Sequence, residues 1–298
     1  MHLKTVIGTM RPRFLLLSLA VVLLGTALAL YDGAPWSGTL FGLLMLGGML
    51  AHATVNMQNE YEDYKSGLDA LTQRTPFSGG SGGLQQHPQS APYVLRTFIV
   101  ALIGLIAIGL YLIYLKGSML LPIGIIGVLI IVSYTSQLTR LPWLCLLSPG
   151  FAFGPLMVLG TYYVWTGGFS FGAFWLSMVP FFLVNNLLLL NQFPDVEADQ
   201  KVGRYNILMR LGKQKSAFIF NGFLGLSFLM IVMAYFTNGL PPTFLISLLT
   251  IFIALPLFLK VMHYYQDSDK LMPALVMNVI ITIVTPLLMA GGLFWAMI

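Results

Sequence analysis

Carboxylate and carboxamide side chains gather in two short stretches of a chain that otherwise carries little charge. Only 10 of the 298 residues are Asp or Glu, and most of them lie within residues 56–69 and 191–204. Oxygen ligands of this kind suit Mg²⁺, which binds one or two carboxylates, water molecules and the phosphate oxygens of a substrate. The two stretches therefore predict a metal site that holds a phosphate-bearing molecule.

The spacing within the two stretches places most of these side chains on one face of a helix, because they recur every three or four residues. In the first stretch these are Asn56, Asn59, Glu60 and Asp63, and in the second they are Asn191, Asp195 and Asp199. Pro194 leaves two arrangements open: a helix that continues through it, or a break at Phe193 followed by a new helical turn. His52, one turn before Asn56, is either a hydrogen-bonded packing residue or a further ligand.

Basic residues accompany both stretches and are candidates for direct contacts to phosphate, because cationic side chains form charge-assisted hydrogen bonds with phosphate oxygens. These candidates are Lys65, Arg74, Lys201 and Arg204. The segment 74–83 is rich in glycine. Three interpretations of it stay open: backbone N–H groups that wrap a phosphate, a mobile lid over the site, or a linker.

The elements that position these residues must lie in lipid. Hydrophobic residues make up 57% of the chain, charged residues 8%, and the mean hydropathy is +0.85, whereas soluble domains carry about 25% charged residues. A helix of about 20 apolar residues crosses a bilayer. Nine such runs lie at 14–31, 36–58, 93–115, 118–135, 144–166, 170–191, 217–237, 241–262 and 273–297. The sequence predicts an all-α polytopic membrane protein, one domain over residues 1–298, with nine transmembrane helices around a central cavity.

The distribution of Lys and Arg predicts the orientation of these helices. If the N-terminus lies in the cytoplasm, every Lys and Arg except Lys116 falls on the cytoplasmic side, as the positive-inside rule requires. Both acidic stretches then face the cytoplasm, where Mg²⁺ and phosphorylated metabolites are available. Because the basic residues lie in short loops between apolar runs, the net charge of +5 does not indicate a nucleic-acid partner.

The two acidic stretches, and their positions at the ends of the second and sixth spans, resemble those of the UbiA superfamily of intramembrane prenyltransferases. Residues 59–69 are similar to the Asn-Asp-Tyr-x-Asp motif of that superfamily, with Glu60 where Asp is usual. Together with residues 191–212, they look most like the 1,4-dihydroxy-2-naphthoate prenyltransferases of menaquinone synthesis. Tyr134 and Arg140 resemble a short Tyr-plus-basic motif after the fourth helix.

This resemblance implies a Mg²⁺-dependent enzyme of a prokaryotic inner membrane. Its partners would be a polyprenyl diphosphate, a small aromatic acceptor, with 1,4-dihydroxy-2-naphthoate the leading candidate, and membrane lipid. The implied metal ligands are Asn59, Asp63, Asp69, Asn191, Asp195 and Asp199. The implied catalytic residues are Asp63, Asp69, Asp195, Asp199 and Tyr134, and Arg140 joins the cationic residues that bind the substrate. The ring of Tyr134 would face an allylic cation, or Tyr134 is an ordinary interfacial tyrosine. The longer carboxylate of Glu60 could still act as a ligand.

A cation-coupled secondary transporter is the alternative function, because such proteins also hold ions with polar groups inside the membrane. A transporter predicts acidic residues near the middle of the bilayer. Here the acidic residues lie at the ends of the predicted spans, which favours the enzyme.

Overall fold

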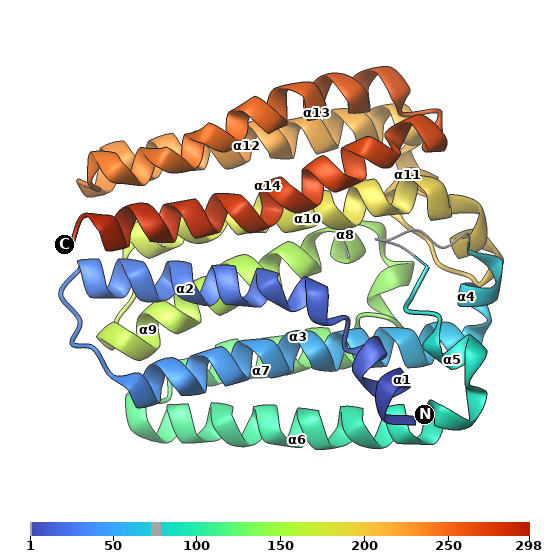
Figure 1. Ribbon diagram of the computed structural model, residues 1–298, viewed down its shortest axis with the longest axis horizontal. Coiled ribbons are helices and arrows are strands. Elements are labelled where there is room, and N and C mark those ends of the chain that lie inside the picture. Colours follow the sequence, from blue (N-terminus) through green and yellow to red (C-terminus); the bar gives the residue numbers. More distant parts are fainter. Residues whose placement is uncertain (1, 73–78) are drawn as a thin grey trace.

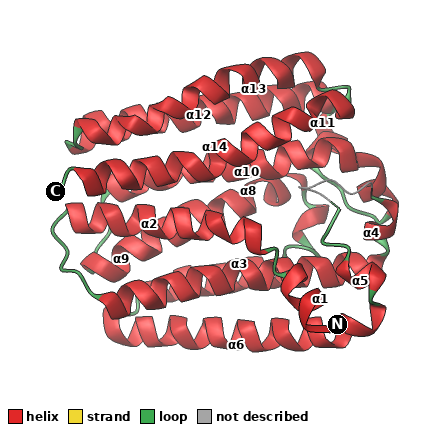
Figure 2. Cartoon of the chain, viewed as in Figure 1, coloured by secondary structure: helices red, strands yellow, loops and turns green. Residues whose placement is uncertain are grey.

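The computed structural model describes residues 2–72 and 79–298, and in this part of the chain the regular structure is helical, without strands (Figure 2). The expected all-α fold is confirmed. Apolar side chains form the core, and Phe193, Phe220 and Phe244 are among the largest that are fully buried.

In its described residues, the first half of the chain contains four longer helices and three short ones. In order they are α1 (His2–Thr9), α2 (Leu16–Tyr31), α3 (Gly38–Ser66), α4 (Leu68–Leu71), α5 (Gly83–Gln86), α6 (Ala91–Lys116) and α7 (Leu120–Ser133). Two 3-10 helices, Pro12–Leu15 and Pro88–Ser90, precede α2 and α6.

The second half begins with a 3-10 turn at Leu138–Arg140 and contains the longest helix of the molecule, α10. The helices are α8 (Pro142–Phe151), a π-helical stretch (Ala152–Leu159), α9 (Gly160–Thr166), α10 (Phe171–Lys201), α11 (Ile207–Leu211), α12 (Lys213–Asn238), a 3-10 helix (Pro242–Thr250), α13 (Ile251–Tyr264) and α14 (Ser268–Trp295). Because α8, the π-helical stretch and α9 are continuous, they form one span, Pro142–Thr166.

Eight helices of the described residues are long and apolar enough to cross a membrane. The predicted span 118–135 corresponds to α7, an apolar helix of only 14 residues, which at 1.5 Å per residue is shorter than the hydrocarbon core of a bilayer. It is short because Gly117, with φ of 105°, stands in the turn before it, and the chain leaves the helix after Ser133. The predicted count of nine spanning helices is therefore not confirmed.

The short helices gather at one end of the bundle. In Figure 1, α1, α4, α5 and α11 lie at the end where α3 and α10 terminate, and the C-terminus lies at the opposite end. The ends of α3 and α10, which carry most of the two acidic stretches, therefore lie at the same end of the molecule.

Glycines set the distance between α10 and the span Pro142–Thr166. A Cβ atom at Gly150 would lie 2.1 Å from the carbonyl oxygen of Phe181, and one at Gly154 would lie 2.4 Å from that of Ser177. Gly150 also donates its backbone N–H to Oδ1 of Asn185 at 2.7 Å. Small residues at this spacing allow membrane helices to approach closely, and this contact holds the second acidic stretch against the centre of the bundle.

Candidate active site

The two acidic stretches come from different helices and line one polar cavity of about 140 Å³. Asn59 and Asp63 lie on α3, whose C-terminus is set by Gly67 in the left-handed conformation, with φ of 76°. The turn at Gly67 starts α4, which carries Asp69. Helix α10 continues through Pro194, so the first of the two arrangements predicted for this proline is the one observed. The cavity is lined by all of the predicted ligands, Asn59, Asp63, Asp69, Asn191, Asp195 and Asp199.

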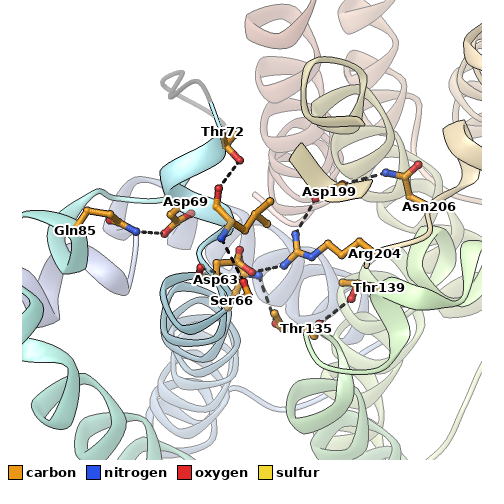
Figure 3. A network of polar contacts seen from close by, with 12 residues as sticks. Asp63, Ser66, Asp69, Thr72, Gln85, Thr135, Thr139, Asp199, Arg204 and Asn206 are labelled. Atoms are coloured by element: carbon orange, nitrogen blue, oxygen red, sulfur yellow. Dashed lines mark hydrogen bonds and ion pairs between the residues drawn. The ribbon is translucent and has the colours of Figure 1, made fainter. Parts of the chain in front are cut away.

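Arg204 joins the two acidic stretches. Its guanidinium forms ion pairs with Asp63 of α3 and with Asp199 of α10, the second at 3.3 Å (Figure 3). Asn206 donates from Nδ2 to the other oxygen of Asp199 at 3.0 Å. Burial by itself would lower the pKa of Arg204, but the negative charges of Asp63 and Asp199 outweigh burial and raise it. The guanidinium therefore stays charged, and its single positive charge is shared between two buried carboxylates.

Asp69 lies on the other side of the cavity, in contact with the start of the second described segment. Gln85 of α5 donates from Nε2 to Oδ2 of Asp69 at 2.7 Å (Figure 3). A Cβ atom at Gly80 would lie 2.8 Å from the same oxygen. Only glycine allows the backbone to pass so close to this carboxylate, and the φ of 71° at Gly80 also favours glycine.

The donor set fits Mg²⁺ that is shared with a substrate better than a metal held by protein alone. Among the described residues no three Asp, Glu, His or Cys side chains converge closely enough to hold a metal ion. Mg²⁺ commonly takes one or two carboxylates and completes its coordination with water and phosphate oxygens. Oδ1 of Asn191 is buried at the cavity without a hydrogen-bond partner in the described part of the chain. An oxygen in this position suits a cation.

A second cavity, apolar and about 640 Å³ in volume, adjoins the polar one. Its lining comes from α2, α3, α6, α7, α10 and the span Pro142–Thr166. The residues that line both cavities, and therefore mark their junction, are Arg11, Asn59, Tyr134, Leu188 and Asn191. A molecule with an anionic head and an apolar tail matches this pair of cavities.

Tyr134, the first residue after α7, is one of the residues at the junction. Burial raises the pKa of its phenol well above the usual value, and the neighbouring Cys145 raises it further. The phenol is therefore protonated at neutral pH and presents an uncharged ring and hydroxyl to the two cavities.

Among the cationic residues predicted to bind the substrate, only one of those described in the structure lines a cavity. Arg204 lines the polar cavity. The side chains of Lys65, Arg140 and Lys201 are exposed, and none of the three lines either cavity. Arg74 lies outside the described residues.

Sequence reasoning missed Arg11, a cation at the junction of the cavities. It lies in the turn between α1 and α2, immediately before Pro12. A signal was present in the sequence, because Arg11 lies shortly before the first apolar run, which begins at residue 14. The positive-inside rule already accounts for a basic residue at this position, so there was no separate reason in the sequence to place Arg11 in the site.

The chain matches the model of the UbiA prenyltransferase family over residues 18–282. A 1,4-dihydroxy-2-naphthoate octaprenyltransferase of Bacillus subtilis is 26% identical over 245 residues, which cover 81% of this chain and 76% of that protein. A 2-carboxy-1,4-naphthoquinone phytyltransferase of Synechocystis is 22% identical over 301 residues, which cover 98% and 94% of the two chains.

Solved structures share the fold over nearly the whole chain. The apo structure of a UbiA homologue from Aeropyrum pernix has a TM-score of 0.73 at 16% identity and covers 95% of this chain and 98% of its own. A UbiA homologue from Archaeoglobus fulgidus, solved with DMAPP and Mg²⁺, has a TM-score of 0.61 at 14% identity and covers 97% and 99%.

These matches decide between the two functions that the sequence left open. A family model that spans most of the chain favours a prenyltransferase over a transporter, and the apolar helices make it an integral membrane protein. The expected likeness to the UbiA superfamily, and within it to 1,4-dihydroxy-2-naphthoate prenyltransferases, is confirmed. The chain belongs to the UbiA prenyltransferase family.

Proposed function

We propose that this enzyme transfers a polyprenyl group from an allylic prenyl diphosphate to a small aromatic acceptor, with Mg²⁺ as cofactor. The observation that carries the proposal is the junction of the two cavities. One cavity is polar and lined by both acidic stretches, and the other is apolar and several times larger. A prenyl diphosphate has the same division, and its reactive carbon lies between its charged head and its tail.

The diphosphate would bind in the polar cavity. Mg²⁺ would be held there by Asn59, Asp63, Asp69, Asn191, Asp195 and Asp199 together with the diphosphate oxygens. When bound it supplies positive charge that stabilises the leaving diphosphate. The Archaeoglobus fulgidus homologues solved with Mg²⁺ and either DMAPP or GPP support both the metal and the class of donor.

Arg204 contributes a fixed positive charge beside the same head group. In the structure this charge compensates Asp63 and Asp199. A diphosphate that binds together with Mg²⁺ would add little net charge to the cavity, so Arg204 would keep its place beside the two carboxylates. From this position the guanidinium could contact the diphosphate.

The apolar cavity would hold the prenyl tail and exclude water from the reacting carbon. The bond between the allylic carbon and the diphosphate oxygen breaks, and the electron pair leaves with the diphosphate. A ring carbon of the acceptor forms the new bond, and the acceptor then loses a proton, or its carboxyl group as CO₂, to restore the aromatic ring. No nucleophilic side chain is required. The uncharged ring of Tyr134 at the junction stabilises positive charge on the allylic group through its π face.

We infer that the acceptor is 1,4-dihydroxy-2-naphthoate, as in the relatives from Bacillus subtilis and Haemophilus influenzae that carry this substrate in their names. The same relationship supports a role in quinone biosynthesis and a bacterial-type inner membrane. We place the N-terminus and the polar cavity on the cytoplasmic side, because that orientation leaves only Lys116 on the other side of the membrane.

The test is turnover by the purified protein in detergent or nanodiscs. It is incubated with Mg²⁺, prenyl diphosphates of graded length and a panel of aromatic acceptors that includes 1,4-dihydroxy-2-naphthoate, and products are identified by mass. A prenylated naphthalene product that disappears with EDTA is expected. If no acceptor in the panel is prenylated with any donor, the proposed function is wrong.

A further inference from the structure

Glu60 stands where the related motif has a metal-binding carboxylate, but both of its oxygens are already engaged. Oε1 accepts from Nε of Arg11 at 2.8 Å and from the backbone N–H of Ser81 at 2.6 Å. Oε2 accepts from the hydroxyl of Ser81 at 2.8 Å. The side chain of Glu60 is 0% exposed, so these donors compensate a buried charge.

The first partner, Arg11, is held in an unusual conformation. It is the one residue other than glycine with a positive φ, 51°, in the described part of the chain. This conformation is disfavoured for residues with a Cβ atom and persists only where surrounding contacts enforce it. The ion pair with Glu60 supplies such a contact.

Arg11 can bind a further group, because Glu60 uses only its Nε atom. No hydrogen bond from its Nη atoms is formed within the described residues, and its side chain is 22% exposed. Arg11 lines both cavities. Its terminal nitrogens are therefore available at the junction where a substrate changes from anionic to apolar.

The second partner of Glu60 is Ser81, which lies in the segment 79–83 next to Asp69. Gly80, its neighbour, passes against the carboxylate of Asp69. The two hydrogen bonds between Ser81 and Glu60 fix this segment to α3. One carboxylate therefore connects the turn before α2 with the backbone that borders the polar cavity.

We propose that Glu60 is a positioning residue and not a metal ligand: it orients Arg11 as a contact for an anionic group of a substrate and fixes Ser81 beside Asp69. The inference deepens the proposed function and rests on it. The anionic group is an oxyanion, either the diphosphate of the donor or the carboxylate of the acceptor. The two sources differ in the Michaelis constant that they would change.

The experiment compares Glu60→Gln with Glu62→Gln. Glu62 lies on the same helix, is partly exposed and lines neither cavity, so its replacement should leave turnover unchanged. In Glu60→Gln, KM for one substrate should rise about tenfold, as expected for loss of one hydrogen bond to a charged group. The Mg²⁺ concentration for half-maximal activity should not change. An increase in KM for the donor identifies the diphosphate, and an increase for the acceptor identifies the carboxylate.

Arg11→Lys and Arg11→Ala provide the second arm. Both should raise the same KM as Glu60→Gln, and the double variant Arg11→Ala with Glu60→Gln should be no worse than Arg11→Ala alone. Hydrogen exchange should become faster at residues 79–83 in Glu60→Gln and stay unchanged in Glu62→Gln. This readout does not depend on activity and shows whether the segment is fixed by Glu60.

Two results would overturn the inference. A higher Mg²⁺ requirement in Glu60→Gln with unchanged KM values would make Glu60 a ligand. Unchanged kinetics with a lower melting temperature would make the contact purely structural. Failure of the proposed function would look different, because the wild-type protein itself would then form no prenylated product.

Discussion

The guanidinium of Arg204 lies between Asp63 of α3 and Asp199 of α10, and it connects two helices whose acidic residues are 136 positions apart in the chain. The three side chains are nearly buried, with 17% of Arg204, 9% of Asp63 and 7% of Asp199 exposed. In the described part of the chain, this arginine is the cationic side chain paired with both carboxylates.

Replacement of Arg204 should therefore destabilise the protein in a way that Mg²⁺ partly reverses. Arg204→Ala leaves two buried carboxylates uncompensated, and loss of one partner of a buried ion pair costs about 3 kcal/mol. We expect a lower melting temperature in EDTA than for the wild type, and a larger increase on addition of Mg²⁺. Thermal unfolding in detergent measures both. An equal response of the two proteins to Mg²⁺ would contradict this role.

Asp195 should be essential for turnover but not for folding. It lines the polar cavity, and Asp195→Asn removes a negative charge from the group that would hold Mg²⁺. Loss of one such electrostatic contact typically lowers kcat by about a hundredfold or more. Glu197→Gln is the matched control, since Glu197 lies two residues further along the same helix and is exposed. Comparable activity of the two variants would exclude Asp195 from the site.

Replacement of Asn191 should preserve or increase the stability of the protein but weaken its use of Mg²⁺. Its Oδ1 atom is buried without a partner among the described residues, and an unsatisfied buried oxygen costs roughly 1–3 kcal/mol. Asn191→Leu should therefore melt at the same or a higher temperature than the wild type in EDTA, yet require more Mg²⁺ for activity. A variant that is less stable in EDTA and has an unchanged Mg²⁺ requirement would assign Asn191 to packing alone.

The apolar cavity should set the length of the donor. A Cβ atom at Gly127 of α7 would meet only Leu156, at 3.9 Å from its Cδ1 atom, so the side chain of Gly127→Leu extends into the cavity that Gly127 lines. We expect activity with short prenyl diphosphates to be retained and activity with long ones to fall. Gly222→Leu, at an exposed site of α12 with no atom within 4 Å of the new Cβ, is the control. Equal loss with all donors would contradict a tail-binding cavity.

The sequence predicted the parts of this site that follow from local spacing. The predicted ligands on α3, α4 and α10 all line the polar cavity, because helical periodicity places Asn191, Asp195 and Asp199 on one face. Hydropathy located eight of the predicted spans, because each is a long apolar helix in the described part of the chain. The span predicted at 118–135 is not confirmed, since the turn at Gly117 shortens α7, a run that composition alone could not distinguish from its neighbours.

The sequence did not predict the contacts between distant segments. Glu60 reaches Arg11, 49 residues earlier, and Ser81, 21 residues later, and no local pattern encodes either contact. The sequence also predicted the same phosphate-binding role for every basic residue near the acidic stretches. Lys65 is exposed to solvent, whereas Arg204 is enclosed between carboxylates, because the turn at Gly203, with φ of 78°, directs the chain back toward α3.

The apolar cavity is bordered by residues of α6 and α7 that are also exposed on the surface of the bundle, among them Leu110, Leu121 and Ile125. In a bilayer this surface would face acyl chains, so the long-chain donor of the proposed function would reach the enzyme by lateral diffusion within the membrane. Its effective concentration is then its mole fraction in lipid and not its amount per volume of solution. Dilution of the donor with inert phospholipid at constant total amount should slow the reaction, as in surface-dilution kinetics.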